Sequence, residues 1–486
     1  MTKRICHSSL MHSRHMRSGL IASILVTALI GCATPATTEP MPPEGATLPS
    51  TLNNHLALLT SEQRAFLVSD EALLIVPSRL RLINELERRS PEQAQGYVSD
   101  MMAAVEALAY RPDQDMDAIP LNREAPNFNN WKVLRPDALR ERQRDPGPFS
   151  LSRYIHPWGG IPTFAGAPVA VTPEDLLVGN VEVAFTGIPQ SLSSGNRDAR
   201  NAPNMIRANY GIASYGVASR DVYTLVDPGA VLNIVDFGDF AVDRLSMARS
   251  VDHIREMVMA LAATGVVPFF AGGDASIMYP TVRGVREAFP DRPVTVVHFS
   301  AHPNAEPPRH HPWSDRDPVY NLVTEGVING HDLIQIGLRG PKATPQQLVW
   351  LRDQGVRYHT MAEVESRGWD HVLQRVLAAA KASGQPVYIS MDASVFDPSE
   401  IPAAGRAVPN GLKISQLQPL IRRLCAETTL AGFELLDLAP MMDFSYVSAL
   451  NSTAMFNACL SGLAMRKVGI TDTDYLAPLA VDHGQP

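Results

Sequence analysis

Three apolar runs, each ending in a short polar sequence, constrain the fold of this chain most strongly. The run VVPFF leads into AGGDAS (Ala271–Ser276), VTVVHF into SAHPN (Ser300–Asn304), and PVYI into SMDASVFDP (Ser390–Pro398). Such short runs, rich in Val, Ile and Phe, are typical of strands that are buried on both faces of a parallel sheet. Open α/β sheets carry their sites at the carboxyl ends of the strands. We therefore expect the three polar sequences to form one site.

Strand and helix patterns alternate beyond Val169. This alternation predicts an α/β fold of three layers, a mostly parallel sheet with helices on both faces. Strands are expected at Val181–Phe185, Val231–Asp236, Leu333–Ile336, Val387–Met391 and Gly432–Leu438. Helices are expected at Asp252–Thr264, Thr344–Gln354, Trp369–Ala382, Ser415–Cys425 and Ala449–Lys467.

The order of the three motifs resembles that of the ureohydrolases, the arginase and agmatinase family. The order is GGD-x-S, then H-x-x-A-H, then S-x-D-x-x-x-x-DP, and further matches extend over roughly Tyr154 to Lys467. They include VDFGD (Val235–Asp239), QIGLRG (Gln335–Gly340) and GFELLDLAP (Gly432–Pro440). The resemblance implies an arginase-like α/β domain and a hydrolase acting on a guanidino compound.

The resemblance also implies a metal site, because six side chains of that family hold two manganese ions. At the corresponding positions this chain retains two residues of the ligand types, His302 and Asp392. The other four metal positions are degenerate, and they hold Ala275, Ser300, Asn304 and Ser394.

One remaining carboxylate is too little charge for two metal ions. Two dications about 3.5 Å apart repel by on the order of 19 kcal/mol at an effective dielectric of about 20. Manganese and magnesium also favour oxygen-rich sites with anionic ligands. We therefore expect no cofactor, with manganese as the ion if the site binds metal at all. A single ion would need a further ligand turned inward, from His298, Asp274 or Glu306.

Asp437 stands where the family has a glutamate that pairs with the substrate guanidinium. Aspartate keeps the charge and loses one methylene group. A carboxylate at a strand end can hold a cationic guanidino ligand, although an ion pair within the fold would use it equally well. His310 and His311 lie in the loop Ala305–Val319 and are expected to be a solvated pair.

The N-terminus has the pattern of a secretory signal. Basic residues precede an apolar run, Leu20–Ile30, which is too short to span a bilayer. The run ends in Leu-Ile-Gly-Cys, which resembles the bacterial lipobox and implies lipidation at Cys32. With Ala33 after the cysteine, the resemblance further implies the periplasmic face of the outer membrane, with the chain attached to the membrane through its lipid anchor. The alternative is a plain signal peptide with an incidental cysteine.

The chain is divided into five predicted segments. Residues 1–31 are a lipoprotein signal peptide, 32–50 a proline-rich tether, 51–150 a helical extension and connector, 151–470 the ureohydrolase-like domain and 471–486 a C-terminal tail. The net charge of −8, without a basic stripe, argues against a nucleic-acid partner. The resemblance implies a homo-oligomer, a trimer or hexamer.

Two cysteines lie in the predicted domain, Cys425 and Cys459, both on expected helices. They could pair in an oxidising periplasm. The distance between them cannot be read from sequence. Two buried, unpaired thiols are the favoured interpretation.

Two hypotheses for the function follow. The favoured one is a ureohydrolase-like envelope lipoprotein without two-manganese hydrolysis, a pseudoenzyme retained for ligand binding or assembly, because four ligand types are lost together while the glycines and strands around them persist. The alternative is an active C–N (amidino) hydrolase with a remodelled metal centre, which would release urea from agmatine or a related guanidino compound.

Overall fold

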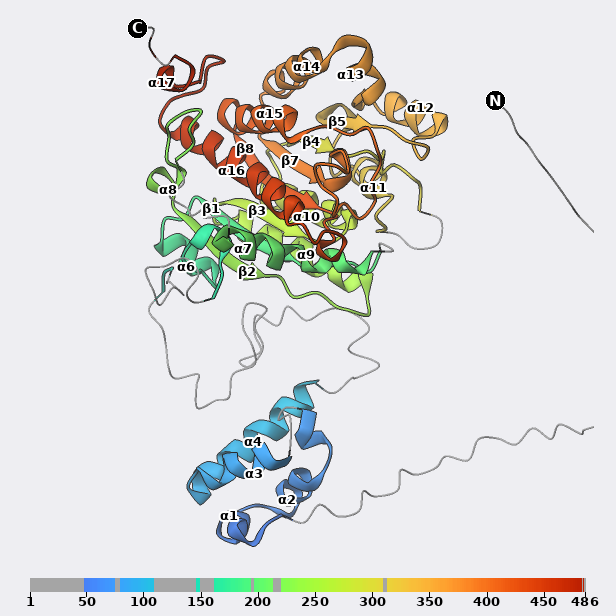
Figure 1. The fold of residues 1–486 in the computed structure, drawn as a ribbon. Coiled ribbons are helices and arrows are strands. Elements are labelled where there is room, and N and C mark those ends of the chain that lie inside the picture. Colours follow the sequence, from blue (N-terminus) through green and yellow to red (C-terminus); the bar gives the residue numbers. More distant parts are fainter. Residues whose placement is uncertain are drawn as a thin grey trace, which may run out of the picture. The chain divides into compact units, whose positions relative to one another are not determined.

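The computed structural model describes residues 48–74, 79–108, 146–148, 161–193, 196–212, 220–308, 313–482 and 484. The chain divides into two compact units, Met1–Glu92 and Gln93–Pro486 (Figure 1). The predicted signal peptide, the lipidation site Cys32, nearly all of the tether and the pair His310 and His311 lie outside the described residues.

The described part of the first unit is helical. It contains α1 (Asn53–Ala57), α2 (Ser61–Val68) and α3 (Arg79–Glu87), and α4 (Pro91–Leu108) begins at its end. Thr60 and Gln63 form a capping box at the start of α2, which satisfies two backbone N–H groups that the helix leaves unpaired. Helix α4 starts at Pro91, a position that suits proline because the first helical residue needs no N–H donor.

The second unit is built on one parallel sheet of eight strands in the order β2-β1-β3-β8-β7-β4-β5-β6. This confirms the predicted α/β class. The strand bounds are β1 (Val183–Ile188), β2 (Ile234–Asp239), β3 (Val267–Gly272), β4 (Thr295–Phe299), β5 (Leu333–Leu338), β6 (Arg357–Thr360), β7 (Val387–Asp392) and β8 (Leu430–Leu436).

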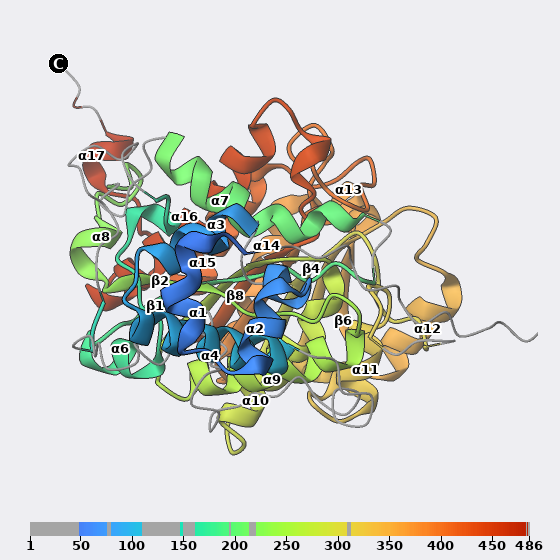
Figure 2. The ribbon, with the colours of Figure 1, turned by 90° about the horizontal axis from the view of Figure 1, so that it is seen from below.

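Helices cover both faces of this sheet, and each face has its own hydrophobic core. Figure 2 shows the two helix layers on opposite sides of the strands. One layer consists of α7 (Ala202–Ile212), α14 (Trp369–Ala382), α15 (Ile414–Glu427) and α16 (Val447–Lys467). The other consists of α6 (Pro173–Val178), α9 (Met247–Ala262), α10 (Met278–Ala288), α11 (Pro318–Thr324) and α12 (Pro345–Asp353). Shorter helices are α8 (Pro228–Val231), α13 (Met361–Arg367) and α17 (Pro478–Val481).

The predicted strands and helices are all present, with ends shifted by a few residues. Helix α9 starts five residues early, at Met247, because the Ser246 side chain accepts a hydrogen bond from the Arg249 N–H and caps the helix. Within the described residues, no helix is long and apolar enough to cross a membrane.

The prediction of two unpaired thiols is wrong, because Cys425 of α15 and Cys459 of α16 form a disulfide with a Cα–Cα distance of 5.4 Å. The two helices pack unusually closely. A side chain at Gly462 would meet the Arg422 carbonyl oxygen of α15 at 2.3 Å, so only glycine permits this approach. Sequence alone does not reveal such a packing distance.

Candidate active site

The three polar motifs meet at one edge of the sheet, as their positions after strands predict. Strands β3, β8, β7 and β4 are neighbours, and Met391 of β7 lies in register with Phe299 of β4 and Leu435 of β8. The next residues along these strands are therefore close together. They are Ser300, Asp392 and, one step further, Asp437.

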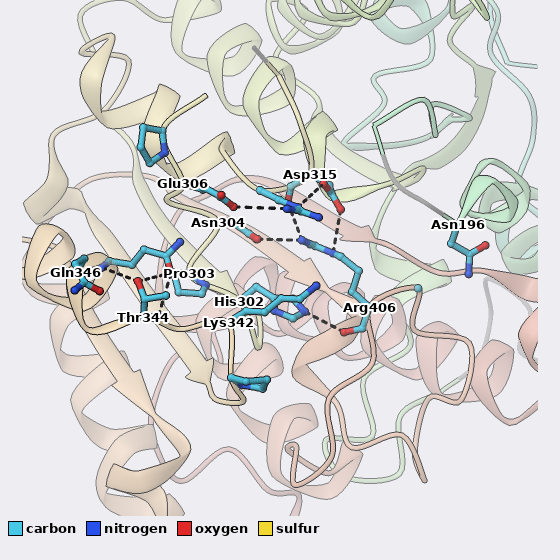
Figure 3. Close-up of a pocket in the computed structure, with 15 residues that line it drawn as sticks. Asn196, His302, Pro303, Asn304, Glu306, Asp315, Lys342, Thr344, Gln346 and Arg406 are labelled. Atoms are coloured by element: carbon cyan, nitrogen blue, oxygen red, sulfur yellow. Dashed lines mark hydrogen bonds and ion pairs between the residues drawn. The ribbon is translucent and has the colours of Figure 1, made fainter. Parts of the chain in front are cut away.

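A cavity of about 820 Å³ opens in front of these strand ends. His302, Asn304, Asp315, Lys342 and Arg406 are among its lining residues (Figure 3). Asp392 and Asp437 are completely buried behind this lining. The site therefore has an open outer part and a sealed inner part.

The guanidinium group of Arg406 fills the inner part. Its Nη2 lies 2.6 Å from Oδ2 of Asp392, and its Nε lies 3.3 Å from Oδ2 of Asp437 and 3.6 Å from Oδ2 of Asp315. Its Nη1 donates to Oδ1 of Asn304 at 3.3 Å and to the Asp315 carbonyl oxygen at 2.8 Å. We call Asp315, Asp392 and Asp437 the carboxylate cluster.

Burial and Arg406 shift the pKa values of the carboxylate cluster in opposite directions. Burial alone would raise the pKa of Asp392, but Arg406 and His302 outweigh it, so this pKa lies below its ordinary value. Burial raises the pKa of Asp437 well above its ordinary value despite Arg406, and burial also raises the pKa of Asp315. Of the three carboxyl groups, Asp392 is therefore the one whose pKa is held low, and it is also the one closest to the guanidinium ion.

Two of the positions predicted to be degenerate metal positions, Ser300 and Ser394, contact each other and bond to Asp392. The Ser300 hydroxyl donates to Oδ2 of Asp392 at 3.2 Å, and it lies 3.4 Å from the Ser394 hydroxyl. The Ser394 N–H donates to Oδ1 of Asp392 at 2.8 Å. Ala275 is buried in the turn after β3 and has no polar side-chain atom to contribute.

Asn304 links the guanidinium to a buried histidine. Its amide nitrogen lies 3.2 Å from Nε2 of His298, while its oxygen accepts from Arg406. Nδ1 of His298 lies 3.3 Å from the Ser390 hydroxyl. Burial lowers the pKa of His298 to about 4, so the ring is neutral at pH 7 and its Nε2 can accept the Asn304 N–H. His298 thereby orients the Asn304 amide.

His302 reaches the same loop as Arg406. Its Nε2–H donates to the Arg406 carbonyl oxygen at 3.0 Å (Figure 3). Burial, together with Arg406, lowers the pKa of His302. The residue lies beside the cavity, and one ring nitrogen is used for holding the backbone of the loop.

A second buried arginine holds that loop from the other side. Arg339, which follows β5, is 9% exposed and burial lowers its pKa to about 10. Among the described residues, its guanidinium donates to backbone carbonyl oxygens alone, which we call the carbonyl cage. They belong to Gly337, Ser394, Val395, Phe396, Val408 and Pro409.

Sequence reasoning overlooked both arginines. Arg406 is the only charged residue between Glu400 and Lys413, and a lone charge in an apolar loop is a signal that could have found it. Arg339 lies inside the QIGLRG motif, where no local pattern marks it as a site residue. Asp437 was expected to hold a cationic ligand or an ion pair within the fold, and the structure pairs it with Arg406.

Comparison with known proteins now identifies the family. The model of the arginase family matches residues 181–461. The chain belongs to the arginase family. A guanidinopropionase from Pseudomonas aeruginosa is 27% identical over 62% of this chain and 91% of its own length.

Solved structures share the fold of this family member. A proclavaminate amidino hydrolase from Streptomyces clavuligerus matches with a TM-score of 0.57 and 24% identity, over 64% of this chain and 99% of that chain. A formiminoglutamase from Trypanosoma cruzi, solved with Mn²⁺, matches with a TM-score of 0.52 and 20% identity, over 59% of this chain and 95% of that chain.

The described part of the present chain contains no group of three or more His, Cys, Asp or Glu side chains arranged to hold a metal ion. This applies to the strand ends as well, where the carboxylate cluster surrounds Arg406.

Proposed function

We propose that this chain is a non-hydrolytic member of the arginase family whose cavity binds a small molecule, with assembly as the other use of the retained domain. The observation that carries the proposal is the state of Asp392. It is the only carboxylate at the six metal positions, and it is already ion-paired with Arg406 at 2.6 Å.

The residues present do not fit two manganese ions. Ser300, Asn304 and Ser394 offer neutral oxygens, and Ala275 offers none. Their polar atoms are used in hydrogen bonds with Asp392, His298 and Arg406. Two adjacent dications need nearby carboxylates to offset a repulsion of on the order of 19 kcal/mol at an effective dielectric of about 20. A water nucleophile activated by two metals is therefore not part of the proposed function.

We further propose that the chain works in the cell envelope, attached through lipid on Cys32. The signal-like N-terminus and the Leu-Ile-Gly-Cys sequence support this location. The Cys425–Cys459 disulfide also supports it, because such bonds persist in oxidising compartments and are rare in the cytosol.

An active amidinohydrolase is the second candidate. His302 and Asp392 both lie at the cavity or directly behind it, and the relatives include a guanidinopropionase and an amidino hydrolase. A substrate of that kind would carry a guanidinium group, and the carboxylate cluster is suited to such a group. Arg406 occupies that cluster in the structure, which favours the first candidate.

Metal content and urea release together decide between the candidates. The full chain, purified in mild detergent, is incubated with manganese, zinc or nickel, desalted and subjected to elemental analysis. It is then mixed with agmatine and guanidino acids, and urea is measured. Near-zero metal and no urea support the non-hydrolytic function. About one or two tightly held ions per chain with urea release would reject it.

A further inference from the structure

We infer that Arg406 is a built-in replacement for the metal ions, so that the strand ends form a guanidinium site that the chain fills with its own side chain. This inference rests on the proposed function and deepens it. It names the group that balances the negative charge remaining at the strand ends, which the absence of metal ligands alone does not explain.

The site matches a guanidinium group in shape and charge. Acceptors for Arg406 come from three separate strand ends, with Asp392 at the end of β7, Asp437 after β8, and Asn304 and Asp315 after β4. A guanidinium ion offers five N–H donors in a fixed plane, whereas an ammonium group is a compact point charge. The side chain of Arg406 is only 13% exposed, so these contacts are largely shielded from water.

The backbone holds Arg406 in this place on both sides. The Gly405 N–H donates to the Asp437 carbonyl oxygen at 2.8 Å, and the Arg406 carbonyl oxygen accepts from His302 at 3.0 Å. Further along, Arg339 binds the carbonyl oxygens of Val408 and Pro409. These contacts hold the segment on both sides of Arg406, so that its side chain stays at the carboxylate cluster.

Gly405 allows the close approach that this arrangement requires. A Cβ atom at this residue would lie 2.5 Å from Oδ1 of Asp437. That oxygen has no hydrogen-bond partner among the described groups. The chain therefore passes directly over the carboxylate, which leaves the space next to it to the Arg406 side chain.

Chemical rescue tests the inference directly. In Arg406→Ala the cluster loses its cation, and we expect the melting temperature of the full chain to fall by about 5–10 °C. Guanidinium chloride at about ten times its Kd should then raise the melting temperature by about 3 °C, relative to sodium chloride of equal ionic strength. The unmodified chain should show no such rise, because its site is filled.

Arg316→Ala is the matched control, since Arg316 lines the same cavity but is 62% exposed, and its ion pairs within the described part of the chain are distant, at 3.9 and 4.0 Å. It should melt like the unmodified chain and should not respond to guanidinium. If Arg406→Ala folds only with guanidinium present, the inference is supported. No response of Arg406→Ala to guanidinium, or failure to fold even with it, overturns the inference.

Metal content provides a second test. In one variant the four degenerate positions are returned to ligands, with Ala275→His, Ser300→Asp, Asn304→Asp and Ser394→Asp. Another variant adds Arg406→Ala to these four changes. We expect manganese, about two ions per chain, only in the variant that also lacks the arginine. Equal manganese content in the two variants, at any level, overturns the inference.

The two proposals can fail separately. Urea release by the unmodified chain, combined with guanidinium rescue of Arg406→Ala, would reject the non-hydrolytic function and keep the guanidinium site. The absence of both would keep the function and reject the guanidinium site.

Discussion

Two arginines of the site, Arg406 and Arg339, each place a guanidinium ion away from water, but different kinds of group surround the two ions. Both guanidinium groups are largely shielded from water. Arg406 belongs to the segment between Ser394 and Pro409, and Arg339 donates to carbonyl oxygens of that segment. Arg406 is surrounded by the carboxylate cluster, which raises its pKa although burial alone would lower it. Arg339 is surrounded by the carbonyl cage, and its pKa is lowered to about 10 by burial.

The two arginines therefore have different roles: Arg406 balances charge, and Arg339 holds the backbone. Arg406 supplies the positive charge that keeps Asp392 ionised in the interior, whereas Arg339 has no ion pair among the described residues and holds the backbone through dipoles. A buried ion pair is costly to break because the remaining charge is left uncompensated. A set of carbonyl groups without its donor loses hydrogen bonds but no charge balance.

The largest effect should come from removing the charge. We expect Arg406→Met to lower the free energy of unfolding by about 3–5 kcal/mol, because Asp392 remains buried without a counter-charge. Urea denaturation at pH 7 provides the measurement. A loss no greater than that of Arg339→Met would erase the distinction between the two arginines.

Lowering the pH should destabilise the protein through the surroundings of Arg406 and not through those of Arg339. His298 touches Asn304, and its pKa is lowered from 6.5 to about 4 in the folded chain. The unfolded chain therefore binds this proton more readily, so stability is retained above about pH 6.5 and is lost as the pH falls towards 4. The full loss from this residue amounts to about 3 kcal/mol.

The variant His298→Gln isolates this loss, since glutamine stays neutral and can still accept the Asn304 N–H. Unfolding free energies measured between pH 7 and pH 4.5 should fall less steeply in the variant than in the unmodified chain. Arg339→Met, tested in parallel, should keep the slope of the unmodified chain. Identical slopes for His298→Gln and the unmodified chain would contradict the assignment of a depressed histidine pKa.

Removing the carbonyl-bound arginine should have a smaller, local effect. Arg339→Met takes the donor from the carbonyl cage without leaving an unpaired carboxylate, and we expect a loss of about 2 kcal/mol in unfolding free energy. Amide hydrogen exchange should accelerate at residues 396–411, where the chain is held by these bonds. Unchanged exchange in this segment would show that the carbonyl cage does not hold it.

The smallest effect is expected at Ser394, which contacts the surroundings of both arginines. Its hydroxyl accepts from the Ala301 N–H at 3.2 Å, while its carbonyl oxygen accepts from Arg339 at 2.7 Å. Ser394→Ala removes the hydroxyl, and with it the bond from Ala301 and the 3.4 Å contact with the Ser300 hydroxyl. The unfolding free energy should fall by about 1 kcal/mol. Exchange at residues 396–411 should remain slow, because the bond to Arg339 involves the backbone. Accelerated exchange there would show that the surroundings of Arg406 and Arg339 are coupled, which contradicts the distinction between them.

The sequence predicted the parts of the site that follow strands. Ser300, Asp392 and Asp437 come after apolar runs, and parallel strands bring their carboxyl ends to one edge. Strand patterns do not predict the roles of Arg406 and Arg339. Arg406 lies 14 residues after Asp392 and 31 before Asp437, in an irregular segment whose path no periodic pattern describes.

The sequence by itself determined the α/β class and the resemblance to the arginase family, because strand periodicity and residue identity are properties of short stretches. Only the tertiary structure decided that Arg406 occupies the carboxylate cluster and that Cys425 lies against Cys459. Both outcomes depend on distances between segments that are far apart in the chain. Those distances are set by the path of a loop and by the packing of two helices at Gly462.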